Sequence, residues 1–219
     1  MVFKDRKEAG RLLAEELGRY RNRKDVLVLG LPRGGVTVAF EIARALGVPL
    51  DLLIVRKIGY PSNPELAVGA VSETGAVALN EDVIAYGVTR DYIEKETARQ
   101  KEEIARRMKL YRGGKGLPSL AGKTVILVDD GIATGATVKA AIATLKKEPI
   151  ARLVAALPVS SQEAAREISG TVDEWVCLQT PYPFYAVGAF FRDFTQVEDD
   201  EVVAMLQESA QEVKPHETD

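Results

Sequence analysis

The sequence has very few of the residues that build covalent or metal-based sites. It contains one cysteine, Cys177, and one histidine, His216, among 219 residues. A single cysteine cannot form an intramolecular disulfide or a cysteine-based metal site. Cys177 lies in an apolar stretch, so we expect a small core residue. The single histidine, His216, lies in a polar tail, where we expect it to have no role, which argues against histidine-based hydrolysis and histidine-rich metal sites.

Long hydrophobic runs are also missing. No apolar stretch approaches the roughly 20 residues that cross a bilayer, and a charged residue, Lys4, already stands near the start, unlike the apolar region of a signal peptide. We therefore expect a cytoplasmic protein without membrane contact.

The overall charge is small, with a formal net charge of −3. This value disfavours a general nucleic-acid binder, and no nucleic acid is expected as a partner. The charge is nevertheless uneven, because residues 99–115 carry a net charge of +5 and residues 198–219 carry −7. We interpret both stretches as solvated faces or as a charge match between subunits.

An alternation of apolar strands and amphipathic helices dominates the chain. With 46% hydrophobic residues, the sequence can form one large domain or a core with an appendage. The pattern is typical of an α/β fold, a parallel sheet with helices on both faces. We predict strands at 26–30, 50–55, 124–129, 152–157 and 174–178, and helices at 5–23, 36–47, 136–147 and 163–169.

Between the second and third of these strands the alternation stops. Glycine and prolines predict a loop at 56–64. The sequence then predicts two short strands joined by a turn, a short helix and a long polar helix. These elements are expected at 66–71, 76–79, 81–86 and 90–112, and an aromatic stretch followed by an acidic helix is expected at 180–219.

The most informative segment is 125–137, VILVDDGIATGAT. Four apolar residues form a buried strand, Asp129 and Asp130 follow it, and a loop of small residues then opens a helix. Backbone N–H groups and threonine hydroxyls at a helix N-terminus can bind a phosphate. Carboxylates accept hydrogen bonds from sugar hydroxyls. The segment therefore suits a ligand that carries both a phosphate and a sugar diol.

This motif resembles the signature that binds phosphoribosyl pyrophosphate (PRPP) in type I phosphoribosyltransferases. Gly131 departs from the family pattern, which usually has an apolar residue or serine there, and a glycine can loosen the loop or let its backbone come closer to a ligand. The resemblance implies a parallel sheet of about five strands. It also implies a core of residues 1–59 and 117–179, an inserted lid at 60–116, and a hood with the C-terminal helix at 180–219.

The resemblance assigns roles to the motif. Asp129 and Asp130 would contact the ribose hydroxyls, and one of them would steady positive charge on the ribose during catalysis. The 5′-phosphate would lie in the loop that follows, formed by Ala133, Thr134, Gly135, Ala136 and Thr137. An ordinary turn with an acidic tip is the structural alternative.

Two further segments resemble the family's pyrophosphate contacts. Arg33 offers a forked set of donors to phosphate oxygens, and Gly34 and Gly35 let the backbone approach the ligand. Family members often have a cis peptide in this loop, and we expect one before Arg33. Arg56 and Lys57, at the end of the second strand, are further candidates for the diphosphate, although basic residues also commonly flank strands.

The aromatic stretch near the C-terminus resembles a nucleobase-binding hood only loosely. The acceptor-binding candidates are Phe184, Tyr185 and Val187, and Asp193 is a candidate contact for the diphosphate or its metal. The alternative is a plain aromatic core beneath the C-terminal helix.

By resemblance, the reaction transfers the phosphoribosyl group of PRPP to a nitrogen nucleophile such as a nucleobase, and releases pyrophosphate. Mg²⁺ would accompany the diphosphate mainly through PRPP oxygens and water, and a homodimer is expected. A regulator that binds PRPP or a nucleotide without catalysis is the second hypothesis. A dinucleotide-dependent oxidoreductase or P-loop enzyme is the third, but segments 114–116 and 121–124 lack the required glycine patterns.

Overall fold

The computed structural model describes residues 1–212, apart from the side chains of Pro64 and Glu65, and His216, which was predicted to have no role, lies outside this range. The chain divides into two compact units. The first contains residues 1–52, 119–134 and 149–219, and the second contains 53–118 and 135–148. No helix in the described part combines the length and the apolarity that a membrane crossing needs.

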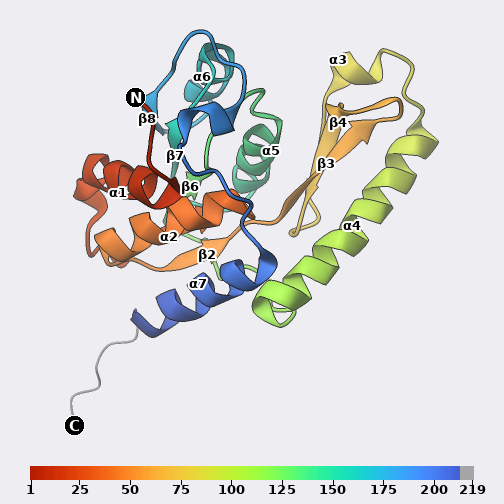
Figure 1. The fold of residues 1–219 in the computed structure, drawn as a ribbon. Helices are drawn as coiled ribbons and strands as arrows, with labels where there is room; N and C mark the ends of the chain where they lie inside the picture. Colours follow the sequence, from red (N-terminus) through yellow and green to blue (C-terminus); the bar gives the residue numbers. More distant parts are fainter. Residues whose placement is uncertain (213–219) are drawn as a thin grey trace. The chain divides into compact units, whose positions relative to one another are not determined.

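The first unit is built on a five-stranded parallel sheet, which confirms the predicted α/β class (Figure 1). The strand order is β2-β1-β6-β7-β8. Because β1 and β6 are direct neighbours, the segments that follow them leave the same edge of the sheet. The strands are β1 (Val26–Gly30), β2 (Leu50–Leu52), β6 (Thr124–Val128), β7 (Arg152–Val159) and β8 (Glu174–Gln179).

Two helices pack against one face of this sheet. Helices α1 (Arg6–Glu16) and α2 (Gly34–Leu46) lie side by side, and both contact its strands. Their apolar residues join those of β1, β6 and β7 in one core, which includes Leu13, Ile42 and Ile126. Burying this apolar surface supplies the main favourable free energy of the unit.

The N-terminal residues of this unit pair with the aromatic segment near the C-terminus. Phe3 forms a parallel bridge with Phe191, and their rings lie 5.3 Å apart. The segment includes a 3-10 helix (Val187–Phe190) and leads to the predicted acidic helix, α7 (Asp199–Glu212). Helix α6 (Gln162–Ser169) connects β7 to β8.

The second unit has its own antiparallel sheet, in the order β3-β4-β5. Its small core includes Ile58, Val68, Val83 and Val88. Helix α5, which begins within the 125–137 segment, packs against all three strands. The elements are β3 (Val55–Tyr60), β4 (Asn63–Ser72), β5 (Val77–Leu79), α3 (Glu81–Ile84), α4 (Arg90–Arg112) and α5 (Ala136–Leu145).

Three predicted elements are wrong in detail. The second parallel strand ends at Leu52, and the predicted loop at 56–64 is mostly strand, because β3 pairs with β4 there. Gly59 lies at a register irregularity of this pair, where a glycine is readily accommodated. The predicted helix at 5–23 ends at Glu16 and is followed by a 3-10 helix at Gly18–Tyr20.

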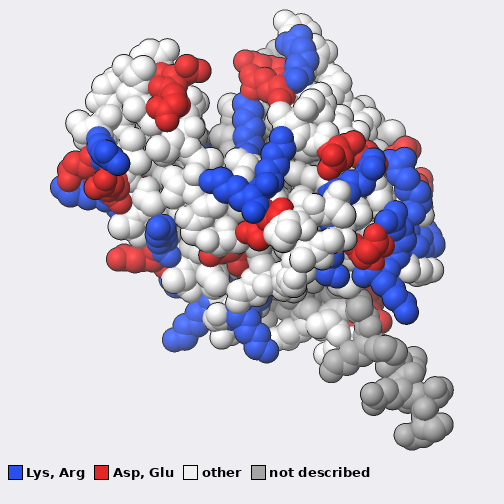
Figure 2. All heavy atoms as spheres, turned by 180° about the vertical axis from the view of Figure 1, so that it is seen from behind, with Lys and Arg blue, Asp and Glu red and all other residues white. Residues whose placement is uncertain are grey.

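The basic stretch at 99–115 belongs mostly to α4, where several of its charges are paired within the helix. Glu96 accepts hydrogen bonds from Arg99, and Glu103 accepts them from Arg106 and Arg107. Pairs three or four residues apart stabilise a helix by only a few tenths of a kcal/mol, about 0.2–0.5 each. Figure 2 likewise shows Lys and Arg interspersed with Asp and Glu on the face that it draws. These observations support a solvated face for this stretch.

Candidate functional site

The two predicted anion-binding segments of the first unit meet at the carboxyl edge of its sheet. Gly30 at the end of β1 is in register with Val128 at the end of β6, and Leu31 N donates to Val128 O at 2.9 Å. Asp129 and Asp130 follow directly on β6. The carboxyl edge of a parallel sheet is where ligands of α/β proteins commonly bind.

Gly34 and Gly35 permit a very close approach to the acid pair. A methyl group on Gly34 would collide with Asp130 Oδ2, and one on Gly35 would lie 2.8 Å from Asp129 Cα. Only glycine leaves room for these carboxylates beneath the loop. The peptide between Pro32 and Arg33 is cis, which confirms the sequence-based expectation.

The acid pair lies in an environment that opposes its ionisation. Burial raises the pKa of Asp129 well above its ordinary value, and the neighbouring carboxylate of Asp130 adds to this effect. Burial also raises the pKa of Asp130, while Arg6 acts in the opposite direction. A cationic or hydroxyl-bearing ligand would relieve the cost of these charges.

Arg6 is a functional candidate that the sequence analysis missed. Its Nε donates to Asp130 Oδ2 at 2.7 Å, and its Nη1 donates to the Thr195 carbonyl at 2.8 Å. The guanidinium also lies 3.8 Å from the centre of the Phe194 ring. A signal was present, because Arg6 is in phase with Ala9 and Leu13, which belong to the apolar stripe of α1.

Arg33 is engaged by the acidic start of the C-terminal helix. Its Nη1 lies 3.1 Å from Glu198 Oε2 and 3.9 Å from Asp199 Oδ1. The Arg33 side chain is 28% exposed, so it remains accessible to solutes. A carboxylate at this position shows that the guanidinium can accept an anionic partner, and a diphosphate would compete with Glu198 for it.

The loop after the acid pair offers a row of backbone donors. Within the described residues, the N–H groups of 133–137 have no hydrogen-bond partner, and no side chain caps α5. Ala133 and Thr134 are exposed. The loop continues along the chain into α5 through Gly135, which has a left-handed conformation (φ 71°). Free N–H groups at a helix N-terminus attract anions.

Ser161 supports this loop and was also missed from the sequence. Its Oγ donates to the Ala133 carbonyl at 2.6 Å and accepts from Ala164 N at 3.1 Å, so it also caps α6. The serine before a helical stretch was a readable cap signal, but its bond to Ala133 joins residues 28 positions apart.

Replacing this serine gives the first testable prediction. We expect Ser161→Ala to lower the free energy of unfolding by about 0.5–2 kcal/mol, because α6 loses its cap. The variant should also bind inorganic phosphate more weakly, since Ala133 loses its support. Thermal melts and phosphate titrations measure both effects, with the exposed Ser169→Ala as the control. Equal behaviour of the two variants would contradict this role.

The predicted hood residues lie in different environments. Phe184 packs against Phe190, with ring centres 5.1 Å apart, whereas Tyr185 is 84% exposed. Val187 occupies the space that a side chain at Gly131 would need, since a methyl group there would lie 2.5 Å from its Cγ1. The glycine at 131 therefore accommodates the 187–190 segment. An acceptor-binding role for Phe184, Tyr185 and Val187 stays a prediction.

The Asp193 carboxylate makes its hydrogen bonds within its own segment. Its carboxylate accepts hydrogen bonds from the N–H and the hydroxyl of Thr195, at 2.9 and 2.6 Å. These bonds lower the pKa of Asp193, so the group is ionised at neutral pH. The described residues contain no cluster of three or more His, Cys, Asp or Glu that can hold a metal ion. Contact between Asp193 and a metal stays a prediction.

Arg56 and Lys57 lie on β3 of the second unit, not at the end of a parallel strand as predicted. Arg56 Nε donates to Gln100 at 2.9 Å. Burial and the nearby positive charge of Arg107 lower the pKa of Arg56. The diphosphate role of both residues stays a prediction.

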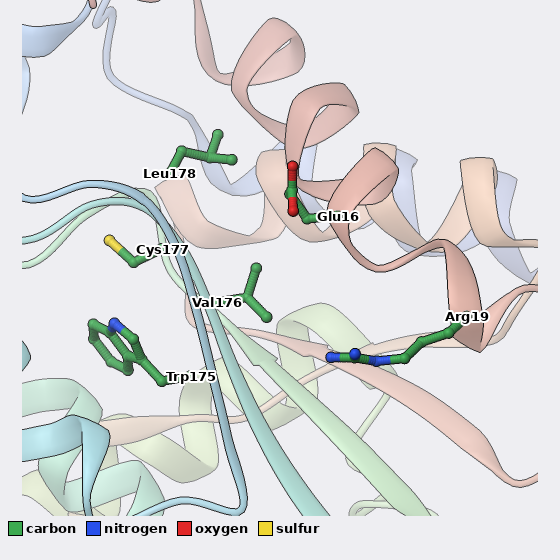
Figure 3. A pocket seen from close by; sticks show the side chains of 6 residues that line it. All are labelled: Glu16, Arg19, Trp175, Val176, Cys177 and Leu178. Atoms are coloured by element: carbon green, nitrogen blue, oxygen red, sulfur yellow. The ribbon is translucent and has the colours of Figure 1, made fainter.

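A separate cavity of about 410 Å³ lies between α1 and the edge strand β8 (Figure 3). Figure 3 shows Val176 on the same side of β8 as Arg19, with Trp175 and Cys177 on the other side. Burial raises the pKa of the Cys177 thiol to about 11, so it stays protonated near neutral pH. Cys177 is only half-buried and lines this cavity, so the prediction of a core residue is wrong.

Comparison with known families decides the assignment. The family model described as "Phosphoribosyl transferase domain" matches residues 4–188. The chain belongs to this family. Both predicted anion-binding segments, 31–35 and 129–137, fall within the matched range.

Relatives at higher identity agree with this membership. Two proteins of Mycobacterium tuberculosis strains, each named "Putative phosphoribosyl transferase", are 46% identical over 207 residues. The match covers 94% of this chain but only 46% of those proteins, so the chain spans about half the length of the curated relatives it matches. A crystal structure of a Thermus thermophilus protein has 45% identity and a TM-score of 0.83, and the match covers 95% of this chain and 99% of that one.

Proposed function

We propose that this phosphoribosyl transferase domain binds PRPP and transfers its 5-phosphoribosyl group to a nitrogen nucleophile, with release of pyrophosphate. The observation that carries the proposal is the contact between the 31–35 loop and the acid pair. Gly34 and Gly35 lie directly over Asp130 and Asp129, so an anion-binding loop and two diol acceptors share one sheet edge. PRPP carries a diphosphate, a diol and a second phosphate on a single ribose.

Each part of the first unit has a matching role. The free N–H groups after the acid pair would bind the 5′-phosphate, and the carboxylates of Asp129 and Asp130 would accept hydrogen bonds from the ribose hydroxyls. The Arg33 guanidinium would bind the diphosphate through two parallel hydrogen bonds. Catalysis then consists of holding the sugar in place and stabilising charge on the departing diphosphate.

Mg²⁺ fits this arrangement as a companion of the diphosphate. The described residues offer no cluster of three metal-binding side chains, so diphosphate oxygens and water would supply most of its ligands, as this ion prefers. When bound, the ion supplies charge neutralisation on the leaving group. Asp129 and Asp130 are already engaged with each other and with Arg6.

A PRPP-binding regulator without catalysis is the second candidate. It is favoured by the contact of Arg33 with Glu198 and Asp199, because these carboxylates lie where a diphosphate is expected. The deciding experiment incubates the protein with PRPP, Mg²⁺ and a panel of purines, pyrimidines and amines, and measures released pyrophosphate. Release with one acceptor supports the transferase. PRPP binding without release by any acceptor supports the regulator.

The role of Arg33 gives the second prediction. We expect Arg33→Ala to weaken binding of PRPP and of pyrophosphate by about 10- to 150-fold, the range for a lost hydrogen bond to a charged group. Binding of ribose 5-phosphate should change little, since it lacks the diphosphate. Calorimetric titration of the three ligands measures the difference.

Two variants sharpen this test. Arg33→Lys keeps the charge without the fork and should fall between the wild type and Arg33→Ala. Glu198→Gln removes a competing carboxylate and should tighten pyrophosphate binding. Equal losses for all three ligands in Arg33→Ala would show that Arg33 does not contact the diphosphate.

A further inference from the structure

Arg6 is a buried cation at the start of α1, with a side chain that is only 10% exposed. Buried arginines require partners because an unpaired buried charge is costly. Its partners come from two distant parts of the first unit: Asp130 lies 124 residues away and Thr195 lies 189 residues away. The Arg6 guanidinium carbon lies over the Phe194 ring, 3.8 Å from its centre, a favourable cation–π distance.

The hydrogen bond from Arg6 occupies one of the two carboxylate oxygens of Asp130. Oδ2 accepts the hydrogen bond from Arg6, whereas Oδ1 has no hydrogen-bond partner among the described residues. A methyl group on Gly34 would lie 2.8 Å from Arg6 Nε and would collide with Asp130 Oδ2. The ion pair therefore fills the space directly beneath the 31–35 loop. Arg6 thereby fixes the carboxylate, with Oδ1 left to accept a ligand hydroxyl.

Two partners of Arg6, Phe194 and Thr195, belong to a segment that is hydrogen-bonded to the N-terminal residues. Phe3 N donates to Phe190 O at 2.8 Å, and Asp193 N donates to Lys4 O at 2.9 Å. Residues 3–4 and 190–193 thus run together, and Arg6 follows at the point where α1 begins. Through Arg6, the acid pair is connected to residues 194–195, which follow the predicted acceptor-binding residues in the chain.

Electrostatics agree with this geometry. The charged groups that act on Asp130 are Asp129 on the same loop and Arg6 from α1, and Arg6 also acts on Asp193. Burial raises the pKa of Asp130, and Arg6 is the cation that opposes this rise. Without it, two adjoining buried carboxylates would have no counter-charge among these groups.

We propose that Arg6 is a positioning residue of the sugar site, which orients the Asp130 carboxylate for a ribose hydroxyl and connects it to the 190–195 segment. That the bound hydroxyl belongs to a ribose rests on the proposed function. The coupling of Arg6 to Asp130 does not depend on it. The two parts can therefore be tested separately.

The test compares Arg6→Gln and Arg6→Lys with Arg11→Gln, which removes an exposed cation from the same helix, 3.8 Å from its nearest carboxylate. In ligand-free protein, carboxyl ¹³C NMR titration should show a higher Asp130 pKa in Arg6→Gln than in the wild type. Arg6→Lys should restore most of that pKa because it retains the charge. Arg11→Gln should leave it unchanged.

PRPP titrations with Mg²⁺ supply the second readout. We expect Arg6→Gln to weaken PRPP binding by about 10-fold or more, with the loss largest between the two Asp130 pKa values, where Asp130 is ionised in the wild type and protonated in the variant. Arg6→Lys should be intermediate, since an ammonium cannot contact Asp130 and Thr195 in the same fork geometry.

An unchanged Asp130 pKa in Arg6→Gln would overturn the coupling. Equal PRPP affinities for Arg6→Gln and Arg11→Gln would overturn the positioning role. A wild type that binds no PRPP, together with the pKa shift in Arg6→Gln, would refute the proposed function and the ligand named here while leaving the coupling of Arg6 to Asp130 established.

Discussion

Asp129→Asn is expected to make the ligand-free protein more stable near neutral pH and to abolish most of its PRPP binding. Asparagine has nearly the same shape and keeps an oxygen that can accept the hydrogen bond from Asp130 N, now 2.9 Å long. It removes the charge that burial and Asp130 both disfavour. Losing a charged acceptor for a ribose hydroxyl should weaken PRPP binding by about 10- to 150-fold.

The sign of the stability effect follows from proton linkage. The folded-state pKa of Asp129 is raised above its unfolded value, so between these two values the folded protein binds more protons than the unfolded chain. Stability therefore falls as pH rises through this window, and the penalty stays constant above it. Asp129→Asn removes the penalty, so its advantage over the wild type should grow from acidic to neutral pH.

Thermal melts of both proteins across this pH range measure the effect. For a protein of this size, each kcal/mol of relieved penalty raises Tm by about 2–4 °C. Glu15→Gln, which removes an exposed carboxylate from α1, should show no such pH-dependent advantage. A lower Tm for Asp129→Asn than for the wild type at neutral pH would contradict the assigned cost of ionising this buried carboxyl group next to Asp130.

Gly35→Ala is expected to have the largest destabilising effect of a single methyl group in this site. The added carbon would lie 2.8 Å from Asp129 Cα and 2.9 Å from Val128 O, which are backbone atoms and cannot rotate away. Overpacking of this kind costs about 1–3 kcal/mol. Movement of the loop away from the acid pair would also separate the diphosphate and ribose contacts.

Calorimetric unfolding and PRPP titration test this prediction together. The control is Gly18→Ala, because a methyl group on Gly18 meets no atom within 4 Å. We expect Gly35→Ala to lower Tm by several degrees, about 2–4 °C per kcal/mol, and to bind PRPP poorly, with Gly18→Ala close to the wild type. Normal stability and affinity in Gly35→Ala would show that the loop and acid pair are not in the tight contact described here.

The sequence correctly predicted the parts of the candidate site that are formed by contiguous residues. The apolar run before Asp129 predicted a buried strand, and the acids at its end lie at the sheet edge next to the 31–35 loop, because the parallel pairing of β1 and β6 brings their ends together. The cis peptide before Arg33 was anticipated from family resemblance alone. The strand and the acid pair, unlike the cis peptide, are encoded locally, in strand and turn patterns.

Features that depend on long-range packing were not predicted. Arg6 pairs with a residue 124 positions away, and no local pattern identifies such a partner. Glycine and prolines at 59–64 indicated a loop, whereas pairing with β4 makes all of 56–60 a strand. The glycine at 131 has its reason in Val187, a contact between distant segments. The choice of acceptor and the expected dimer stay predictions for the same reason.

A crystal structure of the protein with PRPP and Mg²⁺ tests the central claim most directly. We predict ribose hydroxyls within hydrogen-bond distance of Asp129 and Asp130, the 5′-phosphate on the N–H groups of 133–134, and the diphosphate on Arg33 in place of Glu198. PRPP bound elsewhere, or bound with its ribose away from the two carboxylates, would contradict the proposed site.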